Sequence, residues 1–340
     1  MKKLLIVTDA WAPQVNGVAV TTAALAENLR KKNFEVVVVH PGLFSRNWSL
    51  PFYPEIKIPV FPGRRMRTIF NREQPDYVHL ATEGFLGKTA RKVCLKERKP
   101  FTTFYHTHFP LYTQYYVLGG SFIAFFVMRY LRWFHSASSA VMVSTKTLKS
   151  YLEEVGYSSV VVTPLGLDPE RFRRDETQVP ELGLSHPVFV YLGRIAKEKN
   201  VEEFLEAPLP GAKLVIGDGP DRERLEKKYR NEALFVGYRR GQELVQYLSA
   251  ADVCVFPSRT ETFGLVVLEA LACGLPVASH DVMGPRDILT PGVDGEFDEN
   301  LARAATRCLS LSGTRCRETA LKYSWEKSAE VFILHIQEGV

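Results

Sequence analysis

The 340-residue sequence is poor in cysteine and has no long apolar run. Its five cysteines form an odd, scattered set with no CxxC pair, and reduced thiols in a cytoplasmic protein account for them. No stretch of about 18 apolar residues exists, which argues against a transmembrane helix. The longest candidate, residues 116–128, is interrupted by Gly119-Gly120-Ser121. The apolar opening stops at Thr8-Asp9, too early for a signal peptide, and is typical of a first strand.

A dinucleotide fingerprint is also absent. After the first predicted strand the chain runs from Asp9 to Val18 without the GxGxxG pattern. That pattern lets the backbone approach a pyrophosphate, so its absence argues against a nicotinamide or flavin cofactor. The composition, 46% hydrophobic and 24% charged, is typical of globular proteins, and the length suits two domains.

Charge is distributed unevenly along the chain. Residues 1–166 carry 21 Lys and Arg against 10 Asp and Glu, whereas residues 167–340 carry 22 against 28. A basic half joined to an acidic half indicates that only the first half faces an anionic surface, with solvated surface charge as the plainer alternative. No recognisable nucleic-acid-binding module accompanies the charge, so nucleic acid is not an expected partner.

Strand-like and helix-like segments alternate from end to end. The predicted strands are 4–7, 35–40, 77–80, 101–105 and 140–144 in the first half, and 188–192, 213–216, 234–236, 253–256 and 276–278 in the second. Helical spacing is present at 21–32 and 84–96, and residues 325–337 suit a closing helix. This alternation predicts an α/β protein with doubly wound parallel sheets. The irregular polar stretch 164–187 marks the joint between two domains.

The segment from Val253 to Pro276 is the most informative part of the chain. An apolar strand runs into a polar loop, a glycine follows, and an almost wholly apolar helix ends at Gly274. Its one carboxylate, Glu269, needs a hydrogen-bonding partner because a charge in an apolar run is costly. Glu261 lies at the carboxyl end of the strand, where open α/β sheets bind ligands. Two acids beside a helix N-terminus suit a ligand with a phosphate in the middle and hydroxyl groups at both ends.

Four motifs, in order along the chain, resemble those of one enzyme family. They are Pro13-x-x-Asn16-Gly17-Val18, Gly193-Arg194 with Glu198-Lys199, Gly217-Asp218-Gly219-Pro220, and Glu261 followed after seven residues by Glu269. Over essentially its full length the sequence is similar to the retaining glycosyltransferases of family 4. Two further segments, residues 82–84 and 105–110, resemble bacterial members that glycosylate lipids or mannose-containing acceptors.

The resemblance implies the GT-B fold, in which two Rossmann-like domains face each other across a cleft and the C-terminal helix crosses back to the first. We expect an acceptor-binding domain over residues 1–166 with 325–340, and a nucleotide-sugar-binding domain over 167–324. A UDP-hexose or GDP-mannose would then donate a hexosyl group to a lipid or saccharide hydroxyl. The expected location is the cytoplasm, including the inner face of the cell membrane.

The resemblance also implies roles for particular residues. The predicted catalytic residues are Arg194 and Lys199, on the donor phosphates, with Glu261 and His106 on the donor sugar. Arg offers a bidentate fork and Lys a compact charge, so both suit phosphate. Further donor contacts are expected at Gly17, Gly217, Tyr238, Thr262, Phe263, Gly264, Leu265 and, for the ribose hydroxyls, Glu269. The acceptor is expected at Glu83, His108 and Tyr112.

The expected reaction needs no metal and no other cofactor. The chain has no Asp-x-Asp motif, and Arg194 with Lys199 can balance the charge of the leaving phosphate. No first-half acid matches a covalent nucleophile in the family pattern, so we expect a front-side displacement in which the leaving phosphate helps to deprotonate the acceptor. Two other classes stay open: a nucleotide-sugar epimerase of the same fold, and a non-catalytic sugar-nucleotide-binding module.

Residues 109–134 are the candidate membrane-facing segment. They are dense in aromatic and aliphatic side chains with Arg129 and Arg132 interleaved, and Arg64-Arg65-Met66-Arg67 adds a basic cluster. Basic and aromatic residues on an amphipathic helix are typical of a peripheral membrane-binding face. A buried core helix over 122–128 is the alternative, and the sequence leaves both open.

Overall fold

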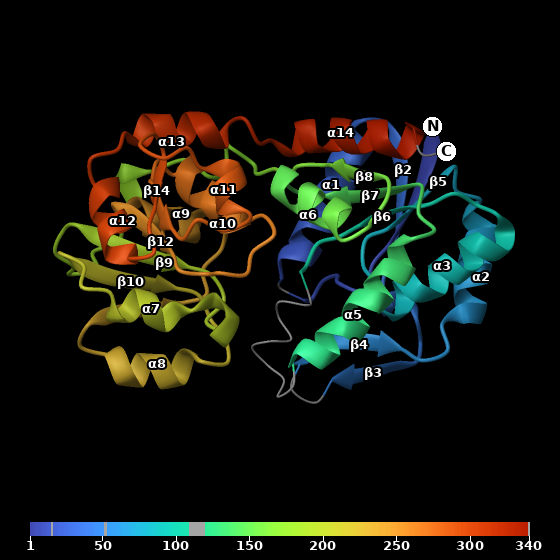
Figure 1. Ribbon diagram of the computed structural model, residues 1–340, viewed down its shortest axis with the longest axis horizontal. Helices are drawn as coiled ribbons and strands as arrows, with labels where there is room; N and C mark the ends of the chain where they lie inside the picture. The colour runs from blue at the N-terminus through green and yellow to red at the C-terminus, as the bar shows by residue number, and fades with distance from the viewer. Residues whose placement is uncertain (15, 51–52, 109–119, 339–340) are drawn as a thin grey trace. The chain divides into compact units, whose positions relative to one another are not determined.

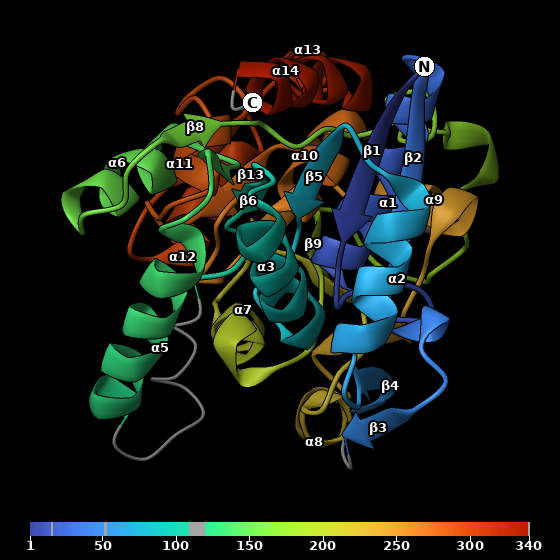
Figure 2. The ribbon, with the colours of Figure 1, turned by 90° about the vertical axis from the view of Figure 1, so that its right-hand side faces the viewer.

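The computed structural model describes residues 1–14, 16–50, 53–108 and 120–338. The predicted acceptor residue Tyr112 lies outside these ranges. The chain divides into two compact units, Met1–Leu165 with Trp325–Val340, and Gly166–Ser324. The joint expected between residues 166 and 167 lies one residue from this division. Figures 1 and 2 show that each unit combines a sheet with several helices.

In the first unit, six parallel strands form one sheet in the order β2-β1-β5-β6-β7-β8. The strands are β1 (Lys2–Val7), β2 (Phe34–Val39), β5 (Tyr77–Leu80), β6 (Thr102–Phe104), β7 (Ala140–Val143) and β8 (Val160–Val162). A separate antiparallel hairpin pairs β3 (Asn47–Leu50) with β4 (Tyr53–Pro59). The sheet strands are apolar runs because a parallel sheet is buried on both faces, and Leu4 to Val7 are fully buried.

Helices cover this sheet. They are α1 (Gly17–Lys31), α2 (Gly63–Glu73), α3 (Phe85–Glu97), α5 (Gly120–His135), α6 (Lys146–Glu154) and α14 (Trp325–Glu338), with a 3₁₀ turn at Pro41–Leu43. Apolar side chains of α2, α3 and the last turns of α5 share one core with β1, β2 and β5. Helix α14, red in Figure 1, packs against α1, and Lys32 pairs with Glu326 and Glu330 of α14. The C-terminal helix therefore belongs to the first unit.

The second unit contains one sheet of six parallel strands in the order β11-β10-β9-β12-β13-β14. The strands are β9 (Val188–Leu192), β10 (Ala212–Ile216), β11 (Ala233–Gly237), β12 (Val253–Phe256), β13 (Val277–Ser279) and β14 (Gly295–Phe297). The helices are α7 (Val201–Glu206), α8 (Arg222–Tyr229), α9 (Gly241–Ser249), α10 (Leu265–Ala272), α11 (Pro285–Ile288), α12 (Leu301–Cys308) and α13 (Gly313–Ala320), with 3₁₀ turns at Glu176–Gln178 and Lys197–Lys199. Residues of α7, α8 and α12 share a core with the sheet, and α10 packs against α13.

The structure corrects the sequence-based prediction in several places. Strand β6 ends at Phe104, one residue before the end of the predicted strand 101–105, so His106 lies two residues beyond the strand rather than directly after it. Helix α1 begins at Gly17, four residues earlier than predicted, because Asn16 caps it by accepting from the Ala19 amide at 2.9 Å. In α5, Ile123, Phe125 and Phe126 are exposed, so the described part of segment 122–128 is not a buried core helix.

Two other expectations concern cysteines and membrane spans. All five cysteines are free and buried, in agreement with reduced thiols. Within the ranges that the structure describes, no helix combines the length and the apolar character needed to cross a membrane.

Candidate active site

The strand order of the second sheet locates a ligand site. From β9 the chain first builds outward through β10 to β11, then returns to place β12 on the other side of β9. The connection after β9 leads to β10 on one side, and the connection after β12 leads to β13 on the other side. Open α/β sheets bind ligands outside the carboxyl ends of the strands at such a switch point. The loops after β9 and β12, residues 193–200 and 257–264, are therefore the candidate site.

The loop after β9 and the loop after β12 meet through two predicted residues. Lys199 Nζ lies 2.8 Å from Glu261 Oε2, and both side chains are about four-fifths buried, with relative exposures of 19% and 18%. Glu261 Oε1 accepts from the Thr262 amide at 3.1 Å. A cation and a carboxylate thus stand together at the switch point, where each has lost part of its hydration. The pair can offer a positive charge to a phosphate and an acceptor to a hydroxyl.

Two hydroxyl groups join the same loops through the backbone. Ser258 and Thr260 donate to the carbonyl oxygen of Glu198, at 3.5 and 3.2 Å. Glu198 itself is buried and precedes Lys199. The position of Lys199 is thereby tied to the loop that carries Glu261.

Three other predicted donor residues follow adjacent strands: Arg194 follows β9, Gly217 follows β10 and Tyr238 follows β11. Arg194 is exposed, and its carbonyl oxygen accepts from the Tyr191 hydroxyl at 2.7 Å. Gly217 has φ +151°, and a Cβ there would stand 1.8 Å from the carbonyl oxygen of Gly193, so this crossing of two loops requires glycine. Tyr238 is exposed directly after β11. These residues lie along the same carboxyl edge as Lys199.

Helix α10 starts beside this pair and carries the second acid. Gly264, at φ +92°, is the N-cap, and the helix begins at Leu265. Glu269 lies four residues later, so it shares a helix face with Leu265, and both are only partly buried. Burial raises the pKa of Glu269 to about 7, and the charge of Arg171 opposes that rise. A ligand hydroxyl that donates a hydrogen bond to Glu269 would stabilise the ionised form of this carboxyl group.

Thr262 and Phe263 fill the space behind the loop. Both are buried, and the Phe263 ring packs edge-on against Tyr323 with centroids 6.0 Å apart. The structure gives Phe263 a packing contact, and it offers no polar side-chain group to a ligand.

In the first unit, the predicted residues His106, His108 and Gly17 have distinct surroundings. The His106 ring stacks on Phe104 with centroids 4.0 Å apart, and burial lowers its pKa to about 3, so the imidazole is neutral near pH 7. His108 is buried beside Tyr151, and burial lowers its pKa as well. Gly17 is exposed at the start of α1, and a Cβ there would meet no described atom within 4 Å.

Glu83 lies in a buried hydrogen-bond network. Its Oε1 lies 3.2 Å from His135 Nε2, and His135 Nδ1 lies 2.8 Å from the Thr103 hydroxyl. Thr103 donates to Ser138, and Ser138 donates to the carbonyl oxygen of His135. The carbonyl oxygen of Glu83 accepts from the Tyr130 hydroxyl. The network fixes the Glu83 side chain, and its predicted contact with an acceptor stays a prediction.

Asp9 occupies the switch point of the first sheet, between β1 and β5. Its carboxylate accepts from the amides of Leu86 and Gly87 at 2.9 and 3.3 Å and from the Thr82 hydroxyl at 2.8 Å. The carboxylate thus caps the N-terminus of α3, a favourable place for a negative charge. Burial raises the pKa of Asp9 in spite of these hydrogen bonds. Within the Thr82-Glu83-Gly84 motif, Thr82 therefore has a structural role, because its hydroxyl holds the Asp9 carboxylate.

Comparison with protein-family models decides the family. Residues 15–171 match Glycosyltransferase Family 4, and residues 172–315 match Glycosyl transferases group 1. Together the two matches cover most of the chain. The chain belongs to the family 4 glycosyltransferases.

Individual relatives agree with this assignment. The glycosyltransferase is 28% identical to a GDP-mannose-dependent alpha-mannosyltransferase of Mycobacterium tuberculosis, over 98% of this chain and 96% of the relative. It is 26% identical to an alpha-monoglucosyldiacylglycerol synthase of Streptococcus pneumoniae, over 97% of this chain and 83% of that one. A sulfoquinovosyl transferase of Arabidopsis thaliana is 29% identical over 87% of this chain, which spans 66% of that longer relative.

The fold agrees as well. A sucrose-phosphate synthase from Thermosynechococcus elongatus matches with a TM-score of 0.79 at 20% identity, over 99% of both chains. At this identity the likeness concerns the fold, which is the GT-B fold expected from the sequence.

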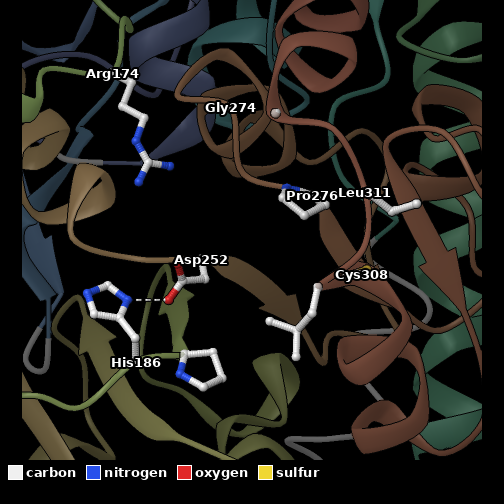
Figure 3. A pocket seen from close by; sticks show the side chains of 10 residues that line it. Arg174, His186, Asp252, Gly274, Pro276, Cys308 and Leu311 are labelled. Atoms are coloured by element: carbon white, nitrogen blue, oxygen red, sulfur yellow. Dashed lines mark hydrogen bonds and ion pairs between the residues drawn. The ribbon is translucent and has the colours of Figure 1, made fainter.

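The second unit of the glycosyltransferase also contains a hollow of about 440 Å³, whose lining residues do not include those of the candidate site. Figure 3 shows the side chains that line it. Its wall includes Pro187, Asp252 and Pro276, each directly before a strand, and Gly274 just after α10. These positions mark the amino edge of the sheet. The carboxyl edge, with Lys199 and Glu261, is the opposite edge.

Sequence reasoning missed the residues that hold the candidate site in place. Ser258 and Thr260 tie its two loops together, although only the family-like residues around them are predicted as functional. In the first unit, the same reasoning missed Asp9, which caps α3. The available signal was position, since each follows a predicted strand at the carboxyl edge. Among the described residues of the glycosyltransferase, no group of three or more His, Cys, Asp or Glu could hold a metal ion.

Proposed function

We propose that this glycosyltransferase moves a hexosyl group from a UDP-hexose or GDP-mannose to a hydroxyl group of a lipid or saccharide. The observation that carries the proposal is the ion pair of Lys199 and Glu261 at the switch point of the second sheet, 2.8 Å apart. A diphosphate ester needs cations where its charge develops, and a donor sugar needs hydroxyl acceptors beside them. One pair of side chains supplies both at one place.

The donor would bind along the carboxyl edge of the second sheet. Lys199 and Arg194 meet the two phosphates, Glu261 accepts hydroxyls of the hexose, and Glu269 accepts hydroxyls of the ribose. Gly217 keeps the neighbouring loop close to the backbone at Gly193. The predicted contacts of Tyr238 and Leu265 belong to the same edge.

We propose a retaining, metal-independent transfer by front-side displacement. Lys199 and Arg194 stabilise the departing diphosphate, which takes the proton of the acceptor hydroxyl as the new glycosidic bond forms. The bond between the anomeric carbon and the phosphate oxygen breaks on the same face of the sugar. His106, as a neutral imidazole, can donate to or accept from a sugar hydroxyl.

A lipid acceptor at an anionic membrane surface fits the first unit. Phe125 of α5 is 62% exposed and Phe61, next to α2, is 90% exposed, while Arg64, Arg65 and Arg67 of α2 are exposed around Met66, which is buried. In α5, Phe126, Tyr130 and Trp133 with Arg129 and Arg132 line a hollow of about 500 Å³. Exposed aromatic rings beside arginines suit the headgroup region of an anionic bilayer. The name of one relative, the alpha-monoglucosyldiacylglycerol synthase, points the same way.

A donor panel tests the proposal. The full chain is mixed with UDP-glucose, UDP-galactose, UDP-N-acetylglucosamine and GDP-mannose, with and without a lipid extract or oligosaccharide mixture, and nucleotide release is measured. Release that depends on the acceptor, with formation of an α-linked product, is the expected result. Isomerised sugar without an acceptor would favour an epimerase, and binding without any turnover would favour a non-catalytic module.

A further inference from the structure

We propose that Glu203 and His280 are positioning residues that hold Lys199 and Glu261 in the arrangement needed to bind a diphosphate. The proposal rests on the proposed function for the role of Lys199. Glu203 lies in α7, and His280 directly follows β13. Neither belongs to the residues assigned to the donor.

The Glu203 carboxylate is the meeting point of three elements. His280 Nε2 lies 3.0 and 3.1 Å from its two oxygens, the Asn200 side-chain amide donates to Oε2, and an Arg259 nitrogen lies 3.9 Å from Oε1. Asn200 ends the loop after β9, and Arg259 belongs to the loop after β12. One carboxylate therefore touches the loop of Lys199, the loop of Glu261 and the end of a third strand.

The hydrogen bonds of His280 fix the orientation of its ring. The ring is fully buried, with Nδ1 3.2 Å from the carbonyl oxygen of Asp298. A carbonyl oxygen only accepts, so Nδ1 carries a hydrogen. Nε2 faces both oxygens of the Glu203 carboxyl group, so a second proton must lie between them. The hydrogen bond between the two groups holds the Glu203 carboxyl group against the end of β13.

The contact of Glu203 with Asn200 holds the turn that presents Lys199. The Asn200 side chain donates to Glu203, and the Glu203 amide donates back to the carbonyl oxygen of Asn200 at 3.1 Å. Asn200 adopts the left-handed conformation with φ +53°, which costs free energy unless local hydrogen bonds favour it. Lys199 is the preceding residue, so the direction of its side chain depends on this conformation.

The Glu203 carboxylate also contacts the loop that carries Glu261, the partner of Lys199. Arg259 stands two residues before Glu261 and is drawn toward Glu203 and, at 3.0 Å, toward Glu299. Thr260, between them, donates to Glu198. Loss of the Glu203 charge would therefore loosen both loops. The loss of Glu203 should therefore weaken binding of the phosphates, which Lys199 contacts, and should leave binding of the base and ribose unchanged.

The test compares diphosphate and nucleoside binding in four variants of the full chain: Glu203→Gln, His280→Leu, His280→Gln and the control Glu202→Gln. Glu202 neighbours Glu203 in α7 but pairs with Arg224 and Lys228 on the surface. Isothermal titration calorimetry with UDP against uridine, and GDP against guanosine, gives the two affinities. Hydrogen exchange of residues 196–203 and 257–264 without ligand gives the mobility of the loops.

We expect Glu203→Gln and His280→Leu to bind the diphosphate about tenfold or more weakly, as a lost charge-assisted contact would, while nucleoside affinity changes less than about twofold. His280→Gln should recover part of the loss because its amide can still donate to Glu203. Exchange in both loops should rise in Glu203→Gln and His280→Leu and stay unchanged in Glu202→Gln.

An equal loss of diphosphate and nucleoside affinity would overturn the proposal, because it would indicate a general effect on folding. Unchanged exchange in both loops would overturn it as well. If the unaltered chain binds neither diphosphate, the proposed function fails by itself, and the exchange experiment still decides whether Glu203 and His280 hold the loops.

Discussion

Lys199 is the residue on which the proposed donor site depends most. Its ammonium group is mostly buried and pairs with Glu261, so it stands where phosphate charge would need it. We expect Lys199→Ala to lower turnover by about 10²–10³-fold, the size of the loss when a group that stabilises developing charge is removed. Lys197→Ala is the matched control, because Lys197 is exposed in the same turn. Initial rates and thermal unfolding of both variants check the prediction, and equal rates for the two would contradict it.

Glu269 makes stability depend on pH. Burial raises its pKa from the ordinary 4.5 to about 7, so between these values the folded chain holds a proton that the unfolded chain has released. The free energy of unfolding therefore falls as the pH rises from about 4.5 to about 7, and this contribution levels off above that. Glu269→Gln removes the effect, so its melting temperature should rise relative to the unaltered chain between pH 5 and pH 8.

The control for this prediction is Glu202→Gln. Hydrogen bonds from Lys228 lower the pKa of Glu202 to about 2, so this carboxyl group stays ionised throughout that range. Its melting temperature should differ from that of the unaltered chain by a constant amount. If the melting temperatures of Glu269→Gln and of the unaltered chain also differed by a constant amount from pH 5 to pH 8, the pKa of Glu269 would not be raised.

At the residue scale, the sequence predicts the meeting of Lys199 and Glu261 but not what holds it. Both residues follow apolar runs that become neighbouring strands, so their common edge follows from the fold class. The contact of Glu203 with His280 joins residues 77 positions apart through packing of α7 on the end of β13. No local pattern marks such a contact, because each residue alone looks like an ordinary helix acid or a buried histidine.

At the scale of elements, the start of α3 leaves no room for a side chain at Gly87. A Cβ on Gly87 would stand 1.9 Å from the carbonyl oxygen of Thr82 and 3.3 Å from the Phe134 ring. The first of these contacts is with backbone, which the Asp9 cap holds in place. We expect Gly87→Ala to lower the free energy of unfolding by about 1–3 kcal/mol, as overpacking does. Denaturant unfolding followed by circular dichroism measures the change.

Gly63→Ala is the control for this substitution. Gly63 is the first residue of α2, and a Cβ there would meet no described atom within 4 Å. Alanine restricts the unfolded chain more than glycine, so Gly63→Ala should be neutral or stabilising by up to about 1 kcal/mol. Equal changes in the free energy of unfolding for Gly87→Ala and Gly63→Ala would mean that the backbone near the Asp9 cap can move to make room for a methyl group at position 87.

The elements that the sequence predicts best are the central strands. β9 and β12 match their predicted ranges because each is a continuous apolar run buried on both faces. β8 and β14 were missed, since each has three residues and lies at the edge of its sheet with partly exposed side chains. The hairpin β3–β4 was missed as well, because prolines at positions 54 and 59 argue against a strand. Edge strands as short as these depend on the neighbouring strand more than on their own pattern.

At the scale of the whole molecule, the first half of the chain carries a net positive charge and the second half a net negative charge. The structure shows where part of the positive charge lies. Arg64, Arg65 and Arg67 are exposed on α2, while Met66 between them is fully buried and orients the helix. Phe61, just before this helix, is the most exposed aromatic side chain among the described residues. The sequence predicted the basic cluster but not this neighbouring ring, because exposure depends on how the chain turns before α2.

This arrangement predicts charge-dependent binding to lipid vesicles. Each arginine near an anionic bilayer contributes about 1 kcal/mol, so replacing Arg64, Arg65 and Arg67 with Ser should weaken binding by roughly 10²-fold at low salt. The difference should shrink as salt increases, because the charges are screened. Replacing Arg224, Lys227 and Arg230 of the second unit with Ser changes the net charge equally and should leave binding unchanged. Sedimentation with phosphatidylglycerol vesicles measures both, and an equal loss in the two triple variants would mean that net charge, rather than the face around α2, drives the association.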